Sequence, residues 1–74
     1  MGDHARSGNI MIGIVAGEIW HYLDKNGEVL FSKLQAGIQQ PRDLVLMSVG
    51  WLAREGHVIV REEGKDYRIS LRKN

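Results

Sequence analysis

Apolar residues recur at spacings of three and four between Ile10 and Asn26. This periodicity puts one set of side chains on a single helix face: Ile12, Val15, Ala16, Ile19, Tyr22 and Leu23. Gly27 follows directly, and glycine commonly ends a helix at that position. The pattern therefore predicts an amphipathic helix over residues 10–26. Residues 1–9 are polar and aperiodic, and we expect a disordered leader there, ahead of one domain over residues 10–74.

A second helical pattern runs from Pro41 to Gly56. Pro41 suits the first helical turn, Asp43 complements the positive end of the helix dipole, and Gly56 suits the left-handed position beyond the C-terminus. Four residues share the face that we expect to enter the core: Val45, Ser48, Val49 and Leu52. Between the two helices, Glu28–Phe31 reads as a short extended segment. Ser32 and Gln35 have the spacing of a capping box, which predicts a short helix from Lys33 to about Ile38 and a turn over residues 39–41.

Near-alternating β-forming residues occupy the C-terminal third of the chain. They predict strands over residues 57–61 and 66–71, joined by a hairpin loop over residues 62–65. The resulting order is helix, short strand, helix, turn, helix, strand, hairpin and strand. This order predicts an α+β fold of the winged helix-turn-helix type, with three helices and a small antiparallel sheet that carries one wing hairpin.

Three short segments resemble a family of short prokaryotic winged helix-turn-helix proteins of uncharacterised function. They are Ala-Gly-Glu-Ile-Trp at residues 16–20, Val-Gly-Trp-Leu-Ala-Arg-Glu-Gly at residues 49–56 and Glu-Glu-Gly-Lys at residues 62–65. The resemblance covers nearly the whole periodic part of the chain. By analogy it implies a DNA-binding or regulatory role, although a fold alone does not determine a function.

Composition narrows the range of functions. With 74 residues and no cysteine, the chain is one small domain without disulfides or thiolate zinc ligands. The three histidines, His4, His21 and His57, are too scattered for a metal motif, and we expect neither a metal nor another cofactor. A Gly-rich phosphate loop, a nucleophile elbow and a His-Glu-x-x-His motif are all missing from the sequence, which argues against an enzyme. Because no apolar run approaches the roughly 20 residues of a membrane span and no signal peptide is visible, we expect a cytoplasmic protein.

Charge bears on the DNA-binding interpretation. The formal net charge is only +1, whereas nucleic-acid binders usually carry a clear basic excess. The outer face of the helix over residues 41–56 carries Leu46, Met47 and Gly50, where a base-reading helix would present arginine, lysine, asparagine or glutamine. We therefore expect weak, poorly specific DNA binding through phosphate contacts. The candidate residues are Lys33, Gln39, Gln40, Arg42, Lys65 and Arg68.

The outer faces of the two long predicted helices, over residues 10–26 and 41–56, suggest self-association. A glycine inside a helix costs about 1 kcal/mol relative to alanine. Gly13, Gly17 and Gly50 together therefore cost about 3 kcal/mol, which suggests that another element approaches the helix backbone closely. Simple exposure of these glycines to solvent is the alternative. The candidate interface of a homodimer comprises Ile10, Gly13, Ile14, Gly17, Leu46, Met47 and Gly50. Trp20 and Trp51, at the borders of the inner faces, are expected to cover the edges of the core.

Two functions remain open from the sequence. The first is a homodimeric winged-helix regulatory protein with weak and poorly specific DNA binding. The second is a protein–protein interaction module on the same scaffold that binds no DNA. The environment of Leu46 and Met47 distinguishes them, because these side chains face either a protein partner or an open basic surface.

Overall fold

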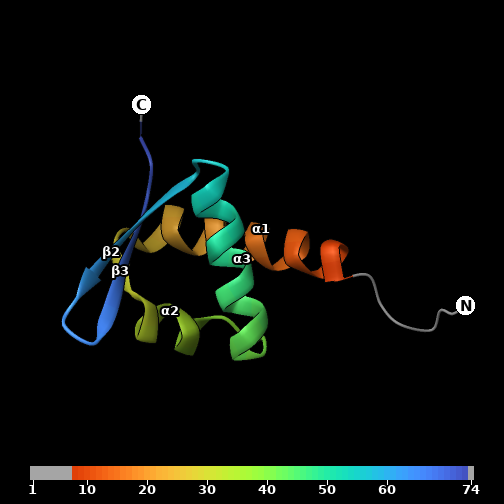
Figure 1. The fold of residues 1–74 in the computed structure, drawn as a ribbon, viewed down its shortest axis with the longest axis horizontal. Helices are drawn as coiled ribbons and strands as arrows, with labels where there is room; N and C mark the ends of the chain where they lie inside the picture. The colour runs from red at the N-terminus through yellow and green to blue at the C-terminus, as the bar shows by residue number, and fades with distance from the viewer. Residues whose placement is uncertain (1–7, 74) are drawn as a thin grey trace, which may run out of the picture.

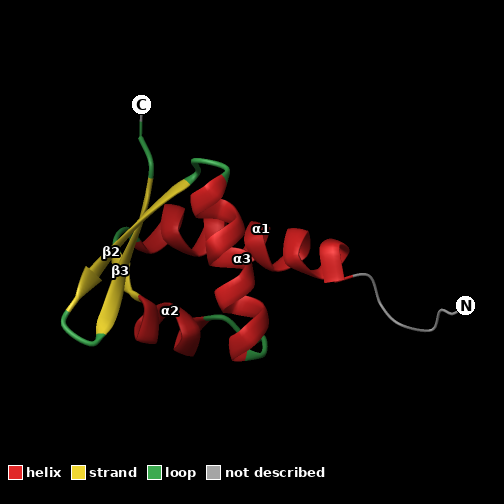
Figure 2. Ribbon diagram, viewed as in Figure 1, coloured by secondary structure: helices red, strands yellow, loops and turns green. Residues whose placement is uncertain are grey.

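The computed structural model describes residues 8–73, which form three helices and a three-stranded antiparallel sheet (Figure 2). The elements are α1 (Gly8–Asn26), β1 (Val29–Leu30), α2 (Phe31–Gly37), α3 (Arg42–Arg54), β2 (Val58–Glu63) and β3 (Asp66–Leu71). This is the α+β architecture that the sequence pattern predicts. α1 begins at Gly8, two residues before the predicted start at residue 10. The remaining residues of the expected leader, 1–7, lie outside the described residues.

The core lies where α1, α2, α3 and the sheet meet. Its most deeply buried side chains come from each of these layers: Val15, Ile19, Leu23, Leu34, Val45, Ser48 and Ile69. The predicted inner faces of the two long helices are confirmed, with Ile12 and Tyr22 only partly covered. Ser48, the buried polar residue, donates from its Oγ to the Leu44 carbonyl at 2.8 Å and to the Ile12 carbonyl at 3.3 Å. Because Ile12 belongs to α1, this hydroxyl joins α3 to α1 where the two helices cross (Figure 1).

Two glycines end the long helices as the sequence predicts. Gly27 has a φ of 79° and Gly56 a φ of 83°, a region that residues with a side chain rarely adopt. The Gly27 N–H donates to the Leu23 carbonyl at 2.8 Å, which completes the last turn of α1. The chain can therefore leave both helices abruptly and enter β1 and β2 after short connections.

The capping-box prediction for α2 is wrong. The helix begins at Phe31 with Leu30 at the N-cap, and no side chain caps it. Ser32 instead donates to Asp66 Oδ2 of β3 at 2.6 Å, and Gln35 donates forward to the Gln40 carbonyl at 3.3 Å. Both polar side chains thus serve tertiary contacts rather than the local contact that their spacing suggests.

The hairpin is longer than predicted, because Glu62 and Glu63 belong to β2 and not to the loop. They pair with Tyr67 and Asp66 of β3, leaving Gly64 and Lys65 as the turn. The sheet order is β1-β3-β2, with Val29 and Val60 both opposite Ile69. In Figure 1 the hairpin stands at one end of the molecule, and the first turns of α1 project past α3 at the other end.

Candidate functional site

The outer side of α3 is apolar and exposed. Leu46, Met47 and Gly50 are all exposed, as the helical pattern predicts. On one side of these residues, between α3 and the hairpin, lies an apolar groove of about 380 Å³ that we call the hairpin groove. Its lining comprises Phe31, Leu46, Val49, Gly50, Ala53, Val60, Tyr67 and Ile69. A groove in this position occupies the space between the third helix and the wing.

One of the candidate DNA-contacting cations, Arg42, lies at the rim of this groove. Its guanidinium lies over the ring of the groove residue Phe31, 5.6 Å from the ring centroid, at the start of α3. Lys33 and Lys65 are the sequence neighbours of Ser32 and Asp66, whose hydrogen bond ties α2 to β3. In Figure 1, α2, the first turn of α3 and the hairpin turn lie along one edge of the domain. Lys33, Arg42 and Lys65, which we call the basic edge, thus come from α2, α3 and the hairpin turn. None of the three forms an ion pair with a described residue.

Arg68, the fourth candidate cation, is neutralised by its neighbours. Its Nε and Nη2 donate to the two Glu63 carboxylate oxygens at 2.7 and 2.6 Å, and Glu28 Oε2 lies 3.9 Å away. The hydrogen bond from Arg68 lowers the pKa of Glu63, and the same bond raises the pKa of Arg68. Arg61 likewise donates to Glu28 at 2.6 Å. Arg61, Glu63 and Arg68 of the hairpin strands are therefore paired, while the exposed Glu62 has no ion pair with a described residue, and the unpaired cation of the hairpin turn is Lys65.

The glutamines of the predicted turn have different environments. Gln39 is exposed, while Gln40 is partly covered and directs its amide towards the Glu18 carboxylate at 3.3 Å. The Gln40 carbonyl also accepts the hydrogen bond from Gln35. Gln40 thus fixes the turn between α2 and α3 against α1, and of the two only Gln39 extends into solvent beside the basic edge.

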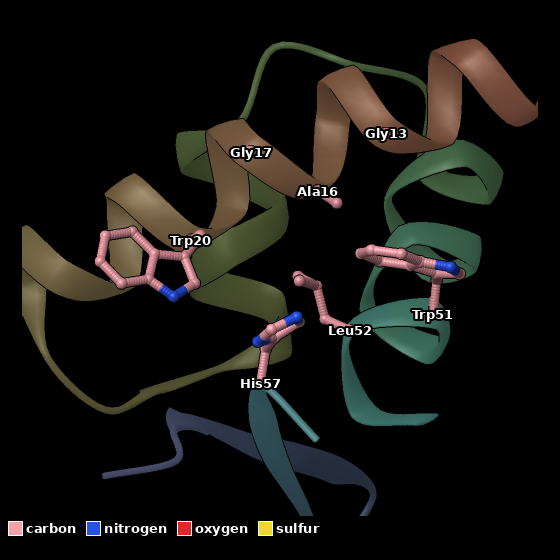
Figure 3. A pocket seen from close by; sticks show the side chains of 7 residues that line it. All are labelled: Gly13, Ala16, Gly17, Trp20, Trp51, Leu52 and His57. Atoms are coloured by element: carbon pink, nitrogen blue, oxygen red, sulfur yellow. The ribbon is translucent and has the colours of Figure 1, made fainter. Parts of the chain in front are cut away.

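A second groove lies on the other side of α3, against α1. It has a volume of about 330 Å³ and is lined by Gly13, Ala16, Gly17, Trp20, Trp51, Leu52 and His57. Figure 3 shows Trp20 and Trp51 at opposite ends of this opening, with Leu52 and His57 between them. A smaller hollow lined by Asn9, Ile12, Gly13 and Trp51 continues it along α1. We call this surface the tryptophan groove.

The predicted dimer-interface residues are divided between the two grooves. Gly13 and Gly17 belong to the tryptophan groove, with the exposed Ile10 and Ile14 beside them on the outer side of α1. Leu46 and Gly50 belong to the hairpin groove, and Met47 lies on the exposed ridge between the two. The predicted set therefore does not form one continuous surface around a single groove.

Residues 3–71 match the family model described as Winged helix-turn-helix domain (DUF2582). The chain belongs to this family. An uncharacterized protein of Methanocaldococcus jannaschii is 34% identical over 64 residues, a match that covers 82% of this chain and 90% of that relative. No solved structure matches this chain. The expected resemblance to a short winged-helix family without a known function is therefore confirmed.

Neither a metal site nor a membrane-spanning helix is present among the described residues. Within residues 8–73, no three His, Asp or Glu side chains gather into a group that could hold a metal ion. No helix in that range is long and apolar enough to cross a bilayer. The two grooves and the basic edge are thus the features from which a function can be argued.

The sequence interpretation missed two features of the site. It assigned Trp20 and Trp51 separately to the edges of the core, whereas the crossing of α1 and α3 makes them the two ends of one groove. It also overlooked Gly37, where an added Cβ would lie 2.8 Å from Cζ of the Tyr22 ring. The signal for the first was that each tryptophan follows a helix glycine closely, Trp51 directly after Gly50 and Trp20 three positions after Gly17.

Proposed function

We propose that this winged-helix domain is a homodimeric regulatory protein that binds duplex DNA weakly and with little preference for sequence. The observation that carries the proposal is the basic edge. Lys33, Arg42 and Lys65 come from three elements that lie along one edge of the domain, and they form no ion pair with a described residue. Cations that form no ion pair can neutralise phosphates, and phosphate contacts supply essentially all of non-specific DNA affinity.

The outer face of α3 supports the low specificity. Base edges are read by side chains that donate or accept two hydrogen bonds, and each good pair gives about 1–3 kcal/mol of discrimination. Leu46, Met47 and Gly50 have no such groups. Apolar contacts with thymine methyl groups are within their chemistry, but those contacts do not define a site. Binding through the basic edge should therefore be governed by the DNA backbone.

The test is a titration of fluorescently labelled duplexes of several unrelated sequences, repeated over a series of salt concentrations. With three phosphates neutralised and about −0.9 per phosphate, the slope of log K against log salt should be no steeper than about −3. Lys65→Ala and Arg42→Ala should weaken binding to every duplex by the same factor. Arg72→Ala removes one charge beyond β3, at the end of the hairpin opposite Lys65, and is the matched control that should change little.

Two results would contradict this proposal. One is a tight consensus site selected from random duplexes at physiological salt, since that requires base-reading groups that α3 does not present. The other is the absence of binding at low salt, which would favour the second candidate function, a protein-interaction module. The specific observation behind that candidate is the apolar lining of the hairpin groove, because exposed apolar surfaces of this kind commonly receive another protein.

A further inference from the structure

The glycines of α1 have no explanation inside a single chain. A Cβ placed at Gly13 or Gly17 would meet no atom within 4 Å, so neither the core nor another element excludes a side chain there. Each glycine nevertheless weakens the helix by about 1 kcal/mol relative to alanine. Gly37 differs, because the Tyr22 ring occupies the space that its Cβ would fill. Nothing within the chain therefore requires a small residue at positions 13 and 17, and the case for a partner at this face depends on its charge and shape.

We infer that the tryptophan groove and the adjoining face of α1 bind a second copy of this chain, with the two α1 helices packed antiparallel about a two-fold axis. This inference rests on the homodimer of the proposed function and specifies its interface. Two further observations, on charge and on exposed area, favour a second copy over other occupants of the groove. They concern the α1 face that runs from Asn9 to His21.

Charge separates this face from the hairpin groove. The side chains of the α1 face that lie between the groove and the outer side are uncharged or polar: Asn9, Ile10, Gly13, Ile14, Gly17, Trp20 and His21. A two-fold interface brings the same patch of both copies together, so like charges would meet in it. An acid- and lysine-free face avoids that repulsion. The hairpin groove, by contrast, has Arg42 at its rim, over the Phe31 ring, so a two-fold contact there would bring two arginines together.

The shape of the face is complementary to itself. In antiparallel packing about an axis between residues 13 and 14, Ile10 meets the second copy's Gly17, and Ile14 meets the second copy's Gly13. Each isoleucine, 63% exposed at residue 10 and 51% exposed at residue 14, thus comes to lie over a glycine that has no side chain. Bulky residues in one copy fill the spaces left by small residues in the other, which lets the helix backbones approach closely.

The exposed area suits a weak dimer, which dissociates on dilution. Trp20 is 38% exposed and Trp51 45% exposed. Because large aromatic side chains have about 150–250 Å² of surface, the two tryptophans leave roughly 150–200 Å² uncovered in each copy. Ile10 and Ile14 raise the apolar area to the order of 400 Å² per copy, within the range of the largest patches on monomers. Two copies would bury about 800 Å² of this side-chain surface, which is below the roughly 1,200 Å² of standard stable interfaces and in the range of weak, transient ones.

The test uses single cysteines, since the chain contains none. Ile14→Cys places a thiol beside the proposed two-fold axis. Met47→Cys is the matched control, because Met47 on the ridge of α3 is 51% exposed, as Ile14 is. Under mild oxidation at micromolar protein concentration, Ile14→Cys should form a disulfide-linked dimer at least about tenfold faster than Met47→Cys. Equal rates for the two variants, or faster linkage through Met47→Cys, would overturn the inference.

Wild-type protein provides a second readout without substitution. Both tryptophans of the chain belong to the proposed interface, so dilution should shift their emission to longer wavelength as the dimer dissociates. Sedimentation should show a change from dimer to monomer over the same concentrations. A monomer at all concentrations would refute the inference, while loss of DNA binding in Lys65→Ala would still support the basic edge. An intact dimer that binds no DNA would support this interface and contradict the proposed DNA binding.

Discussion

The two sides of α3 present apolar grooves of similar size but of different electrostatic character. The hairpin groove has about 380 Å³, and the elements around it carry the basic edge, three cations without ion-pair partners among the described residues. The tryptophan groove has about 330 Å³ and adjoins an α1 face without Lys, Arg, Asp or Glu. Apolar area is common to both and therefore does not distinguish their occupants. Charge does, because a cationic rim favours an anionic polymer, and an uncharged face permits contact with its own copy.

The two sides also differ in what holds them in shape. The tryptophan groove is formed by long helices that cross at a buried contact, where Ser48 hydrogen-bonds to the Ile12 carbonyl. The basic edge depends on exposed polar contacts, chiefly the hydrogen bond from Ser32 to Asp66. We therefore expect perturbations of the hairpin side to change DNA binding while leaving the helix crossing intact.

The largest expected effect is the difference in stability between alanine substitutions at two glycines, Gly37 and Gly50. Gly37→Ala should be less stable than Gly50→Ala by about 1 kcal/mol, because its Cβ would overlap the outer edge of the Tyr22 ring, which would have to turn aside. Gly50→Ala, where a Cβ meets nothing within 4 Å, should stabilise the fold by about 0.5–1 kcal/mol through helix propensity. Urea denaturation of both variants measures the difference. If Gly37→Ala were as stable as Gly50→Ala, the space around the added Cβ would not predict whether a glycine of this chain tolerates a side chain.

A smaller effect tests the tie that holds the basic edge together. The hydrogen bond from Ser32, followed by that from the Tyr67 N–H, lowers the pKa of Asp66 from its ordinary value of 3.8. Because the folded-state pKa is depressed, the stabilisation from this carboxylate is complete above that ordinary value and is lost as the pH falls through the folded pKa. In Ser32→Ala the pKa of Asp66 should rise towards 3.8, which an NMR titration of the carboxyl carbon detects. An unchanged titration would mean that Ser32 does not hold the hairpin to α2.

Helix periods and end signals were enough to predict the fold, since Gly27 and Gly56 end α1 and α3 as expected. The site was harder to predict, and Arg68 shows the reason. Its pairing with Glu63 depends on the hairpin register, which a two-residue turn sets. With residues 62–65 interpreted as loop, Glu63 could not be aligned with its partner. Local spacing also misassigned Ser32, because a residue 34 positions away in sequence competes for its hydroxyl.

The central claim is that the two sides of α3 have separate partners, and the same substitution on each side tests it most directly. Gly17→Lys and Gly50→Lys both add a long cationic side chain where a Cβ meets no atom within 4 Å. We predict by sedimentation equilibrium at micromolar concentration that Gly17→Lys is monomeric, because like charges and bulk enter the two-fold contact. Gly50→Lys should remain a dimer. A monomeric Gly50→Lys, or a Gly17→Lys that associates as wild type does, would contradict the account.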